Sequence, residues 1–474
     1  MTVHAIQTCC DLPAPTTVGR MADHTALMIF GASGDLTSRL LLPALGQLLM
    51  TEPTRTVQLI GAGMDDWTDD KWRDVVQIAF TSSDAADAVA RVETEYHRAD
   101  ITRADDLKTL LDGHEAPLAL YFAVPPSVAA AACDAMATID LPTGVVLALE
   151  KPFGVDEDSA RALNERLALL VPESQVFRID HFLGRSTTLN LLGVRFANRV
   201  LEPLWSATDI ESVSITYDES LGLEGRAGYY DHAGAFVDMI QSHLLQVMAV
   251  FAMEEPATLD EVDFRAATTA VLRATSVWQD DPVHNSYRAR YTAGSVGDRT
   301  FPSYVDEPDV DPARNTETLG AATFEVRNAR WAGVPITLRS GKAIGEPSRE
   351  IVVRFRPVRH VPVGLHGEAE GAVLRFSLGT AEISLELNVN GEADPFELER
   401  TTMSAELGPG ALKAYAEVLS CILDADPVLA VRGDAAEECW RIVQPVLDAW
   451  KAGKVPLEQY SVGSHGPDGW PAAG

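Results

Sequence analysis

Short apolar runs alternate with helical patterns over the first third of the chain. The apolar runs cover 25–30, 57–60, 118–123 and 145–149. Helical patterns separate them at about 40–49, 70–92, 104–112 and 127–138. Strands that alternate with helices form parallel sheets, because each crossover helix covers one face of the sheet. The sequence therefore predicts an α/β domain with a doubly wound parallel sheet.

The pattern changes beyond residue 190. Helical patterns cover 195–205 and 232–254, and a polar segment at 296–317 is expected to be a long surface loop. Strand-like runs with hairpin-length gaps cover 211–217, 322–327, 351–355, 373–378 and 382–387. Alternating strands of this kind are typical of antiparallel sheets. We therefore expect a second, α+β domain with a broad antiparallel sheet and helices.

The length of 474 residues fits more than one domain. Single hydrophobic cores stop growing beyond roughly 250–300 residues. We expect a flexible N-terminal tail over 1–23, a stretch in which Pro13 and Pro15 are followed by two threonines. The predicted parallel sheet then lies in a domain over 24–180, and the predicted antiparallel sheet lies in a domain over 181–474.

The net charge of −31 limits the class of partner. An acidic surface repels nucleic acid and anionic membranes, so neither is expected as a partner. No apolar run approaches the roughly 20 residues of a membrane span. The five cysteines contain no C-x-x-C pair, which favours reduced thiols in a cytoplasm and suggests no metal site.

The turn after the first predicted strand reads Gly31-Ala32-Ser33-Gly34-Asp35-Leu36. Glycines between a strand and a helix let the backbone approach a pyrophosphate, and the helix N-terminus supplies N–H groups. The turn lacks the full G-x-G-x-x-G spacing, so a tight turn without a ligand remains an alternative. Its place in the first βαβ unit favours a dinucleotide, NAD or NADP, with Ser33, Asp35 and Leu36 also lining the site.

The residues after the second predicted strand bear on which dinucleotide is bound. Met64 and Asp65 are followed by Asp66, and the next cation is Lys71. A carboxylate here favours free ribose hydroxyls and repels a 2′-phosphate, which indicates NAD. An equally open interpretation is that both aspartates merely face solvent in a loop.

The stretch Arg178-Ile179-Asp180-His181-Phe182-Leu183-Gly184-Arg185 concentrates ionisable groups. A carboxylate such as Asp180 can orient a base elsewhere, while His181 and Arg185 can bind a phosphate group. A further histidine, His243, lies in an apolar helical run. Taken alone, a histidine in such a run is more often a satisfied core residue than a base.

These motifs together resemble the glucose-6-phosphate dehydrogenase family. The matching segments are the Gly31 turn, Glu150–Gly154, Arg178–Arg185, Arg195–Arg199, Glu224–Arg226, His243–Gln246, Trp331–Pro335, Leu338–Lys342 and Gly463–Pro467. The resemblance covers roughly residues 25 to 470. It implies a Rossmann-like dinucleotide-binding domain followed by a larger α+β domain, and assembly into homodimers or homotetramers through the larger sheet.

The resemblance also implies a reaction. Members of the family oxidise D-glucose 6-phosphate at C1 to 6-phospho-D-glucono-1,5-lactone, with hydride transfer to NAD(P), which begins the pentose phosphate or Entner–Doudoroff pathway. His243 matches the base that takes the C1 hydroxyl proton, and Asp180 matches the carboxylate that orients this base. His181 and Arg185 match positions that hold the 6-phosphate. Lys151 matches a residue between the cofactor and the sugar hydroxyls.

Three more residues take their expected roles from the resemblance alone. Glu219 and Asp238 match ligands of the sugar hydroxyls, and Lys342 matches a basic residue near the sugar. In an α-helix Asp238 and His243 would lie about 140° apart, so they could not share one face.

The chain also departs from the family pattern. Leu40 and Phe182 replace a common lysine and a common tyrosine, Met64 replaces the arginine of NADP users, and Pro347 stands at a frequently basic position. These departures leave open a paralogous dehydrogenase of another phosphorylated or anionic sugar. A non-catalytic homologue that binds a sugar phosphate and regulates metabolism is a further alternative, although such homologues commonly lose the base.

Overall fold

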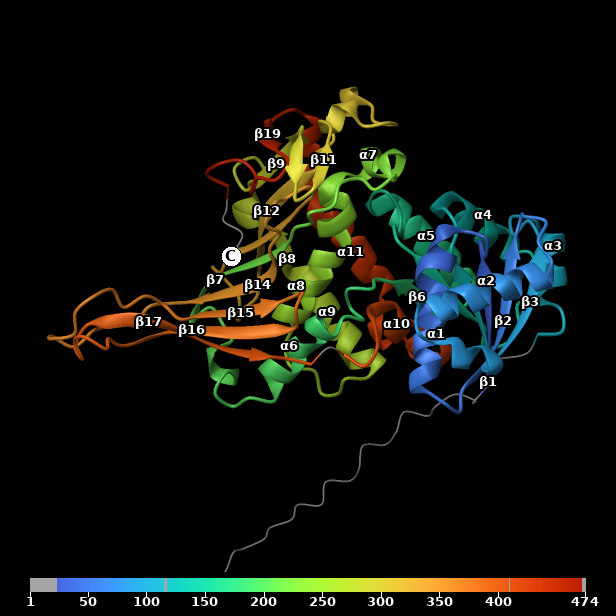
Figure 1. Cartoon of the computed structure of the whole chain (residues 1–474), viewed down its shortest axis with the longest axis horizontal. Coiled ribbons are helices and arrows are strands. Elements are labelled where there is room, and N and C mark those ends of the chain that lie inside the picture. Colours follow the sequence, from blue (N-terminus) through green and yellow to red (C-terminus); the bar gives the residue numbers. More distant parts are fainter. Residues whose placement is uncertain (1–23, 115–116, 409, 471–474) are drawn as a thin grey trace, which may run out of the picture.

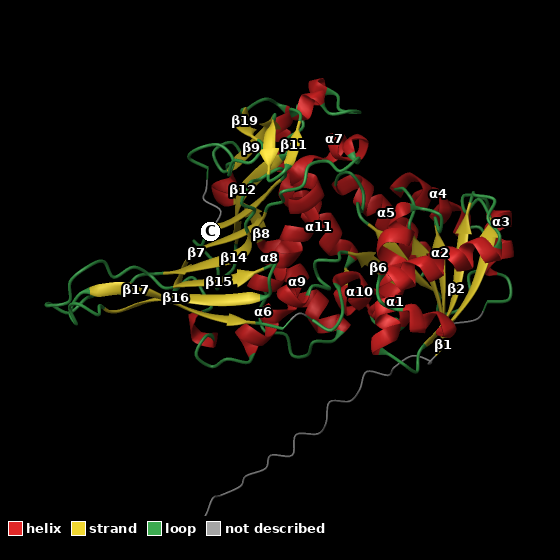
Figure 2. Ribbon diagram, in the orientation of Figure 1, coloured by secondary structure: helices red, strands yellow, loops and turns green. Residues whose placement is uncertain are grey.

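The computed structural model describes residues 24–114, 117–408 and 410–470. The expected N-terminal tail over 1–23 lies outside the described residues. The described chain forms a seven-stranded sheet and a ten-stranded sheet, with helices between them (Figure 1). Figure 2 shows the larger sheet on one side and the smaller sheet, with its own helices, on the other.

The seven-stranded sheet has the order β18-β6-β5-β4-β1-β2-β3. Its strands are β1 (His24–Phe30), β2 (Thr56–Gly63), β3 (Val92–Arg98), β4 (Leu118–Phe122), β5 (Val146–Glu150), β6 (Val176–Ile179) and β18 (Ala430–Val431). Five helices lie between consecutive strands: α1 (Leu42–Thr51), α2 (Asp69–Ser82), α3 (Ala104–Leu111), α4 (Pro126–Met136) and α5 (Glu157–Leu170). The first six strands are parallel in the doubly wound order, which confirms the predicted architecture.

Two strands of this sheet were not predicted, and a third joins it from far along the chain. The helix expected over 70–92 ends at Ser82, and β3 follows at the sheet edge, where its polar side chains gave no apolar signal. The short strand β6 has only four residues and lies inside the Arg178–Arg185 motif. The strand β18 pairs with β6 in antiparallel fashion, so a segment near the C-terminus completes this sheet.

The ten-stranded sheet has the order β17-β16-β15-β14-β7-β13-β12-β9-β19, with β8 paired to β12. Its strands are β7 (Ile210–Tyr217), β8 (Thr275–Val277), β9 (Ser286–Thr292), β12 (Leu319–Val326), β13 (Ile336–Gly341), β14 (Arg349–Phe355), β15 (Val373–Ser377), β16 (Glu382–Asn390), β17 (Leu398–Glu406) and β19 (Leu457–Ser461). The sheet is mostly antiparallel, as expected, but the pairs β7–β13 and β9–β19 are parallel. The β16–β17 hairpin projects away from the rest of the molecule (Figure 1).

Helices fill the space between the two sheets. They are α6 (Ser186–Phe196), α7 (Ala227–Ala235), the π-helix η5 (Phe236–Leu244), α8 (Leu245–Ala252), α9 (Glu261–Ala274), α10 (Ala414–Leu423) and α11 (Gly433–Lys451). The helix expected over 195–205 was wrong, because α6 ends at Phe196. The segment 296–317 is mainly loop and includes β11 (Arg299–Phe301), which pairs with β10 (Gly294–Val296). It is not wholly superficial, because Tyr304 and Glu317 are buried.

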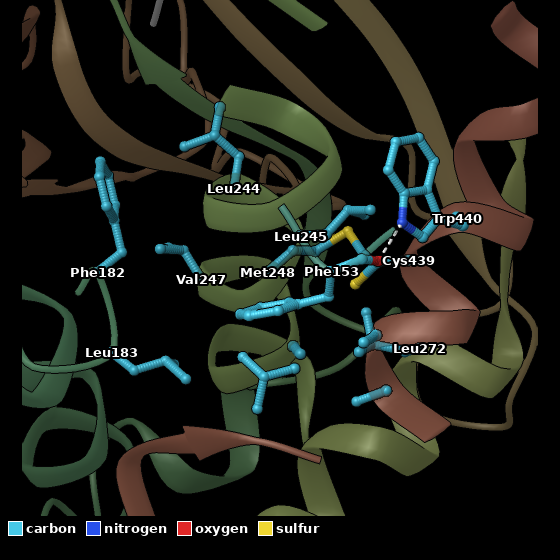
Figure 3. Close-up of a cluster of buried hydrophobic side chains, with 14 of the residues drawn as sticks. Phe153, Phe182, Leu183, Leu244, Leu245, Val247, Met248, Leu272, Cys439 and Trp440 are labelled. Carbon is cyan, nitrogen blue, oxygen red and sulfur yellow. Dashed lines mark hydrogen bonds between the residues drawn. The ribbon is translucent and has the colours of Figure 1, made fainter. Parts of the chain in front are cut away.

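Helix α11 links the two halves of the molecule by packing against α5 on one side and α9 and η5 on the other. Trp440 on α11 donates a hydrogen bond to the carbonyl oxygen of Phe153 at 2.9 Å, amid the apolar cluster of Figure 3. Among the described residues, the helical stretch Ala227–Ala252 has the length and mean hydropathy (1.4) of a membrane span. Its apolar window is 94% buried inside the protein, which is typical of a core helix.

Candidate active site

The predicted base and its predicted carboxylate are in direct contact. Asp180 follows β6, His243 lies in η5, and His243 Nδ1 is 2.5 Å from Asp180 Oδ1. Both side chains are almost completely buried. The backbone N–H of Phe182 donates to the same carboxylate oxygen at 3.0 Å. An ionised carboxylate only accepts hydrogen bonds, so this contact assigns the imidazole proton to Nδ1 and leaves a lone pair on Nε2.

Burial and mutual attraction set the charge states of this pair. Burial lowers the pKa of His243, because it disfavours the imidazolium, and the charge of Asp180 offsets only part of this effect. Burial would raise the pKa of Asp180, but the charge and hydrogen bond of His243 hold that pKa below its usual value. Near neutral pH the pair is therefore a neutral imidazole beside a carboxylate, the state that a general base requires.

The helix that carries His243 is not an α-helix at this point. Phe236–Leu244 forms a π-helix, whose hydrogen bonds join residues five apart. A π-helix has more residues per turn than an α-helix, so Asp238 and His243 lie much closer to one face than the separation of about 140° that an α-helix gives, and that expectation was wrong. The charge of Asp238 acts directly on His243 and raises its pKa, against the larger effect of burial.

Lys151 joins the first sheet to this helix. It follows β5, and its Nζ donates to the backbone oxygen of Asp238 at 2.6 Å and to Oδ1 at 3.2 Å. Burial would raise the pKa of Asp238, but the charges of Lys151 and Lys342 hold it at about 2. The carboxylate of Asp238 therefore stays ionised, and it can accept hydrogen bonds from ligand hydroxyls.

Glu219 and Lys342 form a second ion pair close to Asp238. Lys342 Nζ lies 2.7 Å from Glu219 Oε2, and both side chains are mostly buried. Glu219 follows β7 and Lys342 follows β13, and these two strands are parallel neighbours. Their carboxyl ends therefore meet at one edge of the sheet, which explains the contact between residues far apart in the sequence. A carboxylate beside an ammonium presents an acceptor and a donor to a polyol.

The two residues predicted to hold phosphate also lie near His243. The ring of His181 is 4.7 Å from the ring of His243, centroid to centroid. Arg185 stacks on Phe182, with its Cζ 4.1 Å from the ring centroid, and its Nη1 donates to the hydroxyl of Tyr217 at 3.0 Å. Phe182 in turn stacks on His243 at 4.3 Å. The structure thus brings His181 and Arg185 together around the predicted base.

Three residues near this site were missed from the sequence. Glu150 is buried, which raises its pKa to about 7 although hydrogen bonds from Tyr121 and Tyr415 lower it in part. The hydroxyl of Tyr121 lies 2.6 Å from Glu150 Oε1. The ring of Tyr415, on α10, stacks on His181 at 5.3 Å. Glu150 could have been noted beside Lys151, but no local pattern marks Tyr121 or Tyr415.

The Gly31 turn has the shape that a dinucleotide requires. Gly31 has a φ of 81°, and a Cβ there would lie 2.4 Å from the carbonyl oxygen of Ala123 at the end of β4. Only glycine therefore fits where β1 and β4 diverge, at the topological switch point of the sheet. Gly34 and Leu36 are partly exposed and Asp35 is exposed, so ligand atoms can reach the turn.

The end of β2 folds back onto this turn. Ser33 Oγ donates a hydrogen bond to Asp65 Oδ2, so Asp65 belongs to the turn rather than to a detached loop. Met64 is exposed. Asp66 Oδ1 lies 3.3 Å from Nη1 of Arg98, the last residue of β3. Lys71 is the next cation along the chain, but Arg98 lies closer in space to Asp66, which was not expected because β3 was not predicted.

The turn and the histidine pair lie at the same edge of the seven-stranded sheet. Gly31, Lys151 and Asp180 each follow the carboxyl end of a parallel strand, namely β1, β5 and β6. In open α/β sheets, ligands bind at this edge. Within the described parts of the chain, no group of three or more His, Cys, Asp or Glu side chains is arranged to hold a metal ion.

Comparisons with known proteins agree with this geometry. The family model described as "Glucose-6-phosphate dehydrogenase, NAD binding domain" matches residues 28–190, and the one described as "Glucose-6-phosphate dehydrogenase, C-terminal domain" matches 192–472. A glucose-6-phosphate 1-dehydrogenase of Gluconobacter oxydans is 38% identical over 464 residues, covering 93% of this chain and 94% of the relative.

Solved structures show the same relationship. A glucose-6-phosphate 1-dehydrogenase from Mycobacterium avium superposes with a TM-score of 0.82 and 32% identity, covering 94% of this chain and 95% of that one. A glucose-6-phosphate dehydrogenase in complex with its substrate glucose 6-phosphate also gives 0.82, at 29% identity, covering 95% and 97%. The resemblance inferred from the motifs is therefore confirmed, and the chain belongs to the glucose-6-phosphate dehydrogenase family.

Proposed function

We propose that this protein oxidises D-glucose 6-phosphate at C1 to 6-phospho-D-glucono-1,5-lactone. The observation that carries the proposal is the buried pair of His243 and Asp180, in which a neutral imidazole keeps its Nε2 lone pair. Membership of the family supports the substrate. A bound nicotinamide dinucleotide, NAD(P), supplies the acceptor for the hydride that leaves C1.

In this proposal His243 Nε2 takes the proton of the C1 hydroxyl. Positive charge then develops on the imidazole, and Asp180 stabilises that charge through its contact at Nδ1. General base catalysis of this kind contributes roughly 10²–10⁴ in rate. The burial of the pair supports the role, because the interaction of two charges is strengthened where water is excluded.

The remaining predicted residues orient the sugar. Asp238, Glu219 and Lys342 provide acceptors and donors for its hydroxyls, and Lys151 reaches the same helix from the cofactor side. His181 and Arg185 bind the 6-phosphate. Burial keeps the pKa of the His181 imidazole well below its usual value. A phosphate dianion bound beside the ring would raise that pKa, because a nearby negative charge favours the protonated imidazole.

We infer that NAD is the preferred dinucleotide. Gly31, Ser33, Gly34, Asp35 and Leu36 would hold the pyrophosphate, with Met64 and Asp65 at the ribose. The Ser33 bond directs Asp65 towards this turn, where a carboxylate accepts from ribose hydroxyls and repels a 2′-phosphate. Steady-state kinetics with NAD and NADP side by side test the inference. Asp65→Ala should raise the relative efficiency with NADP, whereas a wild type that prefers NADP contradicts it.

Activity assays test the reaction itself. Purified protein should reduce NAD or NADP when glucose 6-phosphate is added, and the absence of reduction with both cofactors would refute the proposal. The alternative is a paralogous dehydrogenase that oxidises another sugar, which is suggested by the exposed Leu40 and by Phe182. Assays with a panel of other phosphorylated and anionic sugars distinguish it from our proposal. Under our proposal glucose 6-phosphate gives the highest kcat/KM of the panel.

We also infer how the chain is organised. Residues 24–180 would bind the dinucleotide, and residues 181–474 would bind the sugar and form a homodimer or homotetramer through the larger sheet. Light scattering should give a mass of two or four chains, and a monomer at assay concentration would contradict this. A cytoplasmic location is consistent with Cys133, Cys421 and Cys439, which form no disulfide; cell fractionation tests it.

A further inference from the structure

The predicted phosphate site lacks the hydroxyl that the family tyrosine supplies at position 182. A different hydroxyl lies close to this position. Tyr217 ends β7, its ring packs edge-on against Phe182 at 4.9 Å, and its oxygen accepts a hydrogen bond from Arg185 Nη1 at 3.0 Å. Arg185 Cζ is 5.1 Å from the Tyr217 ring centroid. The guanidinium of Arg185 therefore rests on two aromatic rings at once.

A second arginine contacts the same tyrosine. Arg349 begins β14 and pairs with Tyr217 across the antiparallel β7–β14 ladder. Its Cζ lies 5.1 Å from the Tyr217 ring centroid, and its Nε donates to the backbone oxygen of Asp218 at 3.0 Å. This backbone bond fixes the stem of Arg349 while it uses only one of five N–H donors.

Arg185 and Arg349 place two positive charges around the ring of Tyr217. Within the described ranges, neither forms an ion pair with a carboxylate, although Asp and Glu outnumber Lys and Arg by 69 to 38 in this chain. Two unneutralised guanidinium groups on one aromatic ring repel each other. A dianion that contacts both converts this repulsion into attraction, so the arrangement favours a doubly charged ligand.

The tyrosine hydroxyl is oriented to take part. Because Arg185 donates to its oxygen, the phenol hydrogen remains available for an anion. Tyr217 is mostly buried, which strengthens such a bond, and helix α6 begins directly after Arg185, so its first N–H groups add positive potential.

We propose that Tyr217 and Arg349 complete the phosphate site with Arg185, and that together they bind the terminal oxygens of a phosphate monoester. The pair replaces the hydroxyl absent at Phe182 and the positive charge absent at Pro347. This inference rests on the proposed function for the identity of the sugar, but not for the recognition of phosphate.

Variants at the two positions test the proposal. Tyr217→Phe removes one oxygen and leaves the ring contacts with Phe182, Arg185 and Arg349 intact. It should raise KM for glucose 6-phosphate by about 10-fold, the usual cost of one hydrogen bond to a charged group, with little change in kcat. Arg349→Met should raise KM at least as much, and Arg349→Lys less. The KM for the dinucleotide and kcat/KM for unphosphorylated glucose should not change.

Arg354→Met is the matched control, because it removes an exposed arginine from the same strand. An unchanged KM in Tyr217→Phe and Arg349→Lys, both with a wild-type melting temperature, would overturn the proposal. So would equal losses with phosphorylated and unphosphorylated glucose, since these indicate a structural role. If Arg349→Met does not fold, Tyr217→Phe and Arg349→Lys still decide the outcome.

Calorimetric titration with inorganic phosphate separates this inference from the proposed reaction. Wild-type protein should bind phosphate. Tyr217→Phe and Arg349→Met should each bind it about 10-fold more weakly. If the wild type fails to oxidise glucose 6-phosphate but phosphate binding still depends on Tyr217 and Arg349, the reaction is refuted and the phosphate site stands. If an active wild type and both variants bind phosphate equally, the reaction stands and the site is refuted.

Discussion

The imidazole of His243 is surrounded by groups that act on it in opposite directions. Burial and the charge of Lys151 lower its pKa, while Asp180 and Asp238 raise it. The balance keeps the ring neutral and able to accept a proton. Lys151, Asp180 and Asp238 therefore each contribute to setting the basicity of His243.

Replacing the base gives the most direct prediction. His243→Asn keeps a polar side chain that can still donate to Asp180, so folding and dinucleotide binding should be preserved. Without an imidazole no group takes the C1 proton, and kcat should fall by roughly 10²–10⁴. Initial rates and dinucleotide titrations measure the two effects, and an unchanged kcat rules out His243 as the base.

Asp180→Asn should change the pH profile as well as the rate. Under the proposed mechanism, activity should be lost at low pH, as His243 becomes protonated. Because the charge of Asp180 raises the pKa of His243, its removal should lower that pKa and move the acid limb of kcat/KM to lower pH. The maximal kcat should also fall, since the imidazolium loses its counter-charge. An acid limb that stays in place or moves to higher pH contradicts this account.

The π-helix η5 depends on how its N-terminus is held. The preceding helix α7 is interrupted at Gly234, which has a φ of 66° and a ψ of 176°. The buried carboxylate of Glu317 accepts a hydrogen bond from the backbone N–H of Phe236 at 3.0 Å. A kink and a capping carboxylate thus define where the helix that carries Asp238 and His243 begins.

Gly234→Ala should disturb this arrangement. The conformation is nearly exclusive to glycine, and a Cβ would lie 2.3 Å from Glu317 Oε1. We expect a loss of about 1–3 kcal/mol in the free energy of unfolding, and a lower kcat because His243 moves. Gly228→Ala in α7 is the control, since a Cβ there meets no atom within 4 Å. Equal effects of the two substitutions in denaturation and kinetics would contradict the role of the kink.

Glu317 also makes the stability of this element depend on pH. Burial raises its pKa to about 7, although the hydrogen bond from Phe236 and the charge of Arg288 lower it in part. Between about pH 4.5 and 7 the folded protein holds a proton that the unfolded chain has released, so this contribution to stability is lost as pH rises.

Glu317→Gln removes this titration and keeps a carbonyl that can accept from Phe236. The free energy of unfolding of the wild type, relative to that of the variant, should fall by on the order of 3 kcal/mol between about pH 5 and 8. Urea denaturation of both proteins at the two values measures the difference. A difference that is constant with pH, or that grows with pH, would contradict it.

One carboxylate connects segments from both halves of the chain. Glu173 Oε1 lies 2.9 Å from Arg178 Nη1 and 2.7 Å from Arg265 Nη2, and it accepts from the backbone N–H of Gly433 at 3.0 Å. Arg178 and Arg265 are buried. The contacts join α9 and the start of α11 to β6, the strand that leads to Asp180.

Glu173→Ala should therefore destabilise the protein more than a surface change does. It leaves two buried guanidinium groups without this carboxylate, at a cost of about 2 kcal/mol, less than for a fully buried pair because Glu173 is 43% exposed. Glu202→Ala, which breaks an exposed pair with Arg199, is the control and should have little effect. Thermal melting measures the loss of stability in each variant. Equal decreases in the melting temperature would contradict a special role for Glu173.

The residues alone predicted the parallel sheet and the Gly31 turn, whereas the pairing of Asp180 with His243 was predicted from the resemblance to the family. Strand and helix periodicities can be recognised within a short stretch of sequence. The same is true of motifs such as the Gly31 turn and Arg178–Arg185, which contain the reactive groups themselves. Boundaries failed where local signals were weak, as at β3, which has a polar sheet-edge sequence, and at α6.

Other features arise only from packing between distant segments. Tyr217 and Arg349 meet across a ladder whose register no local pattern specifies. Tyr415 reaches His181 from a helix near the C-terminus. The π-helix that carries Asp238 and His243 begins just after the kink at Gly234, and Glu317 caps its N-terminus; local helix propensity does not encode either feature. The free energy of such long-range contacts, rather than the preference of any one segment, determined these parts of the site.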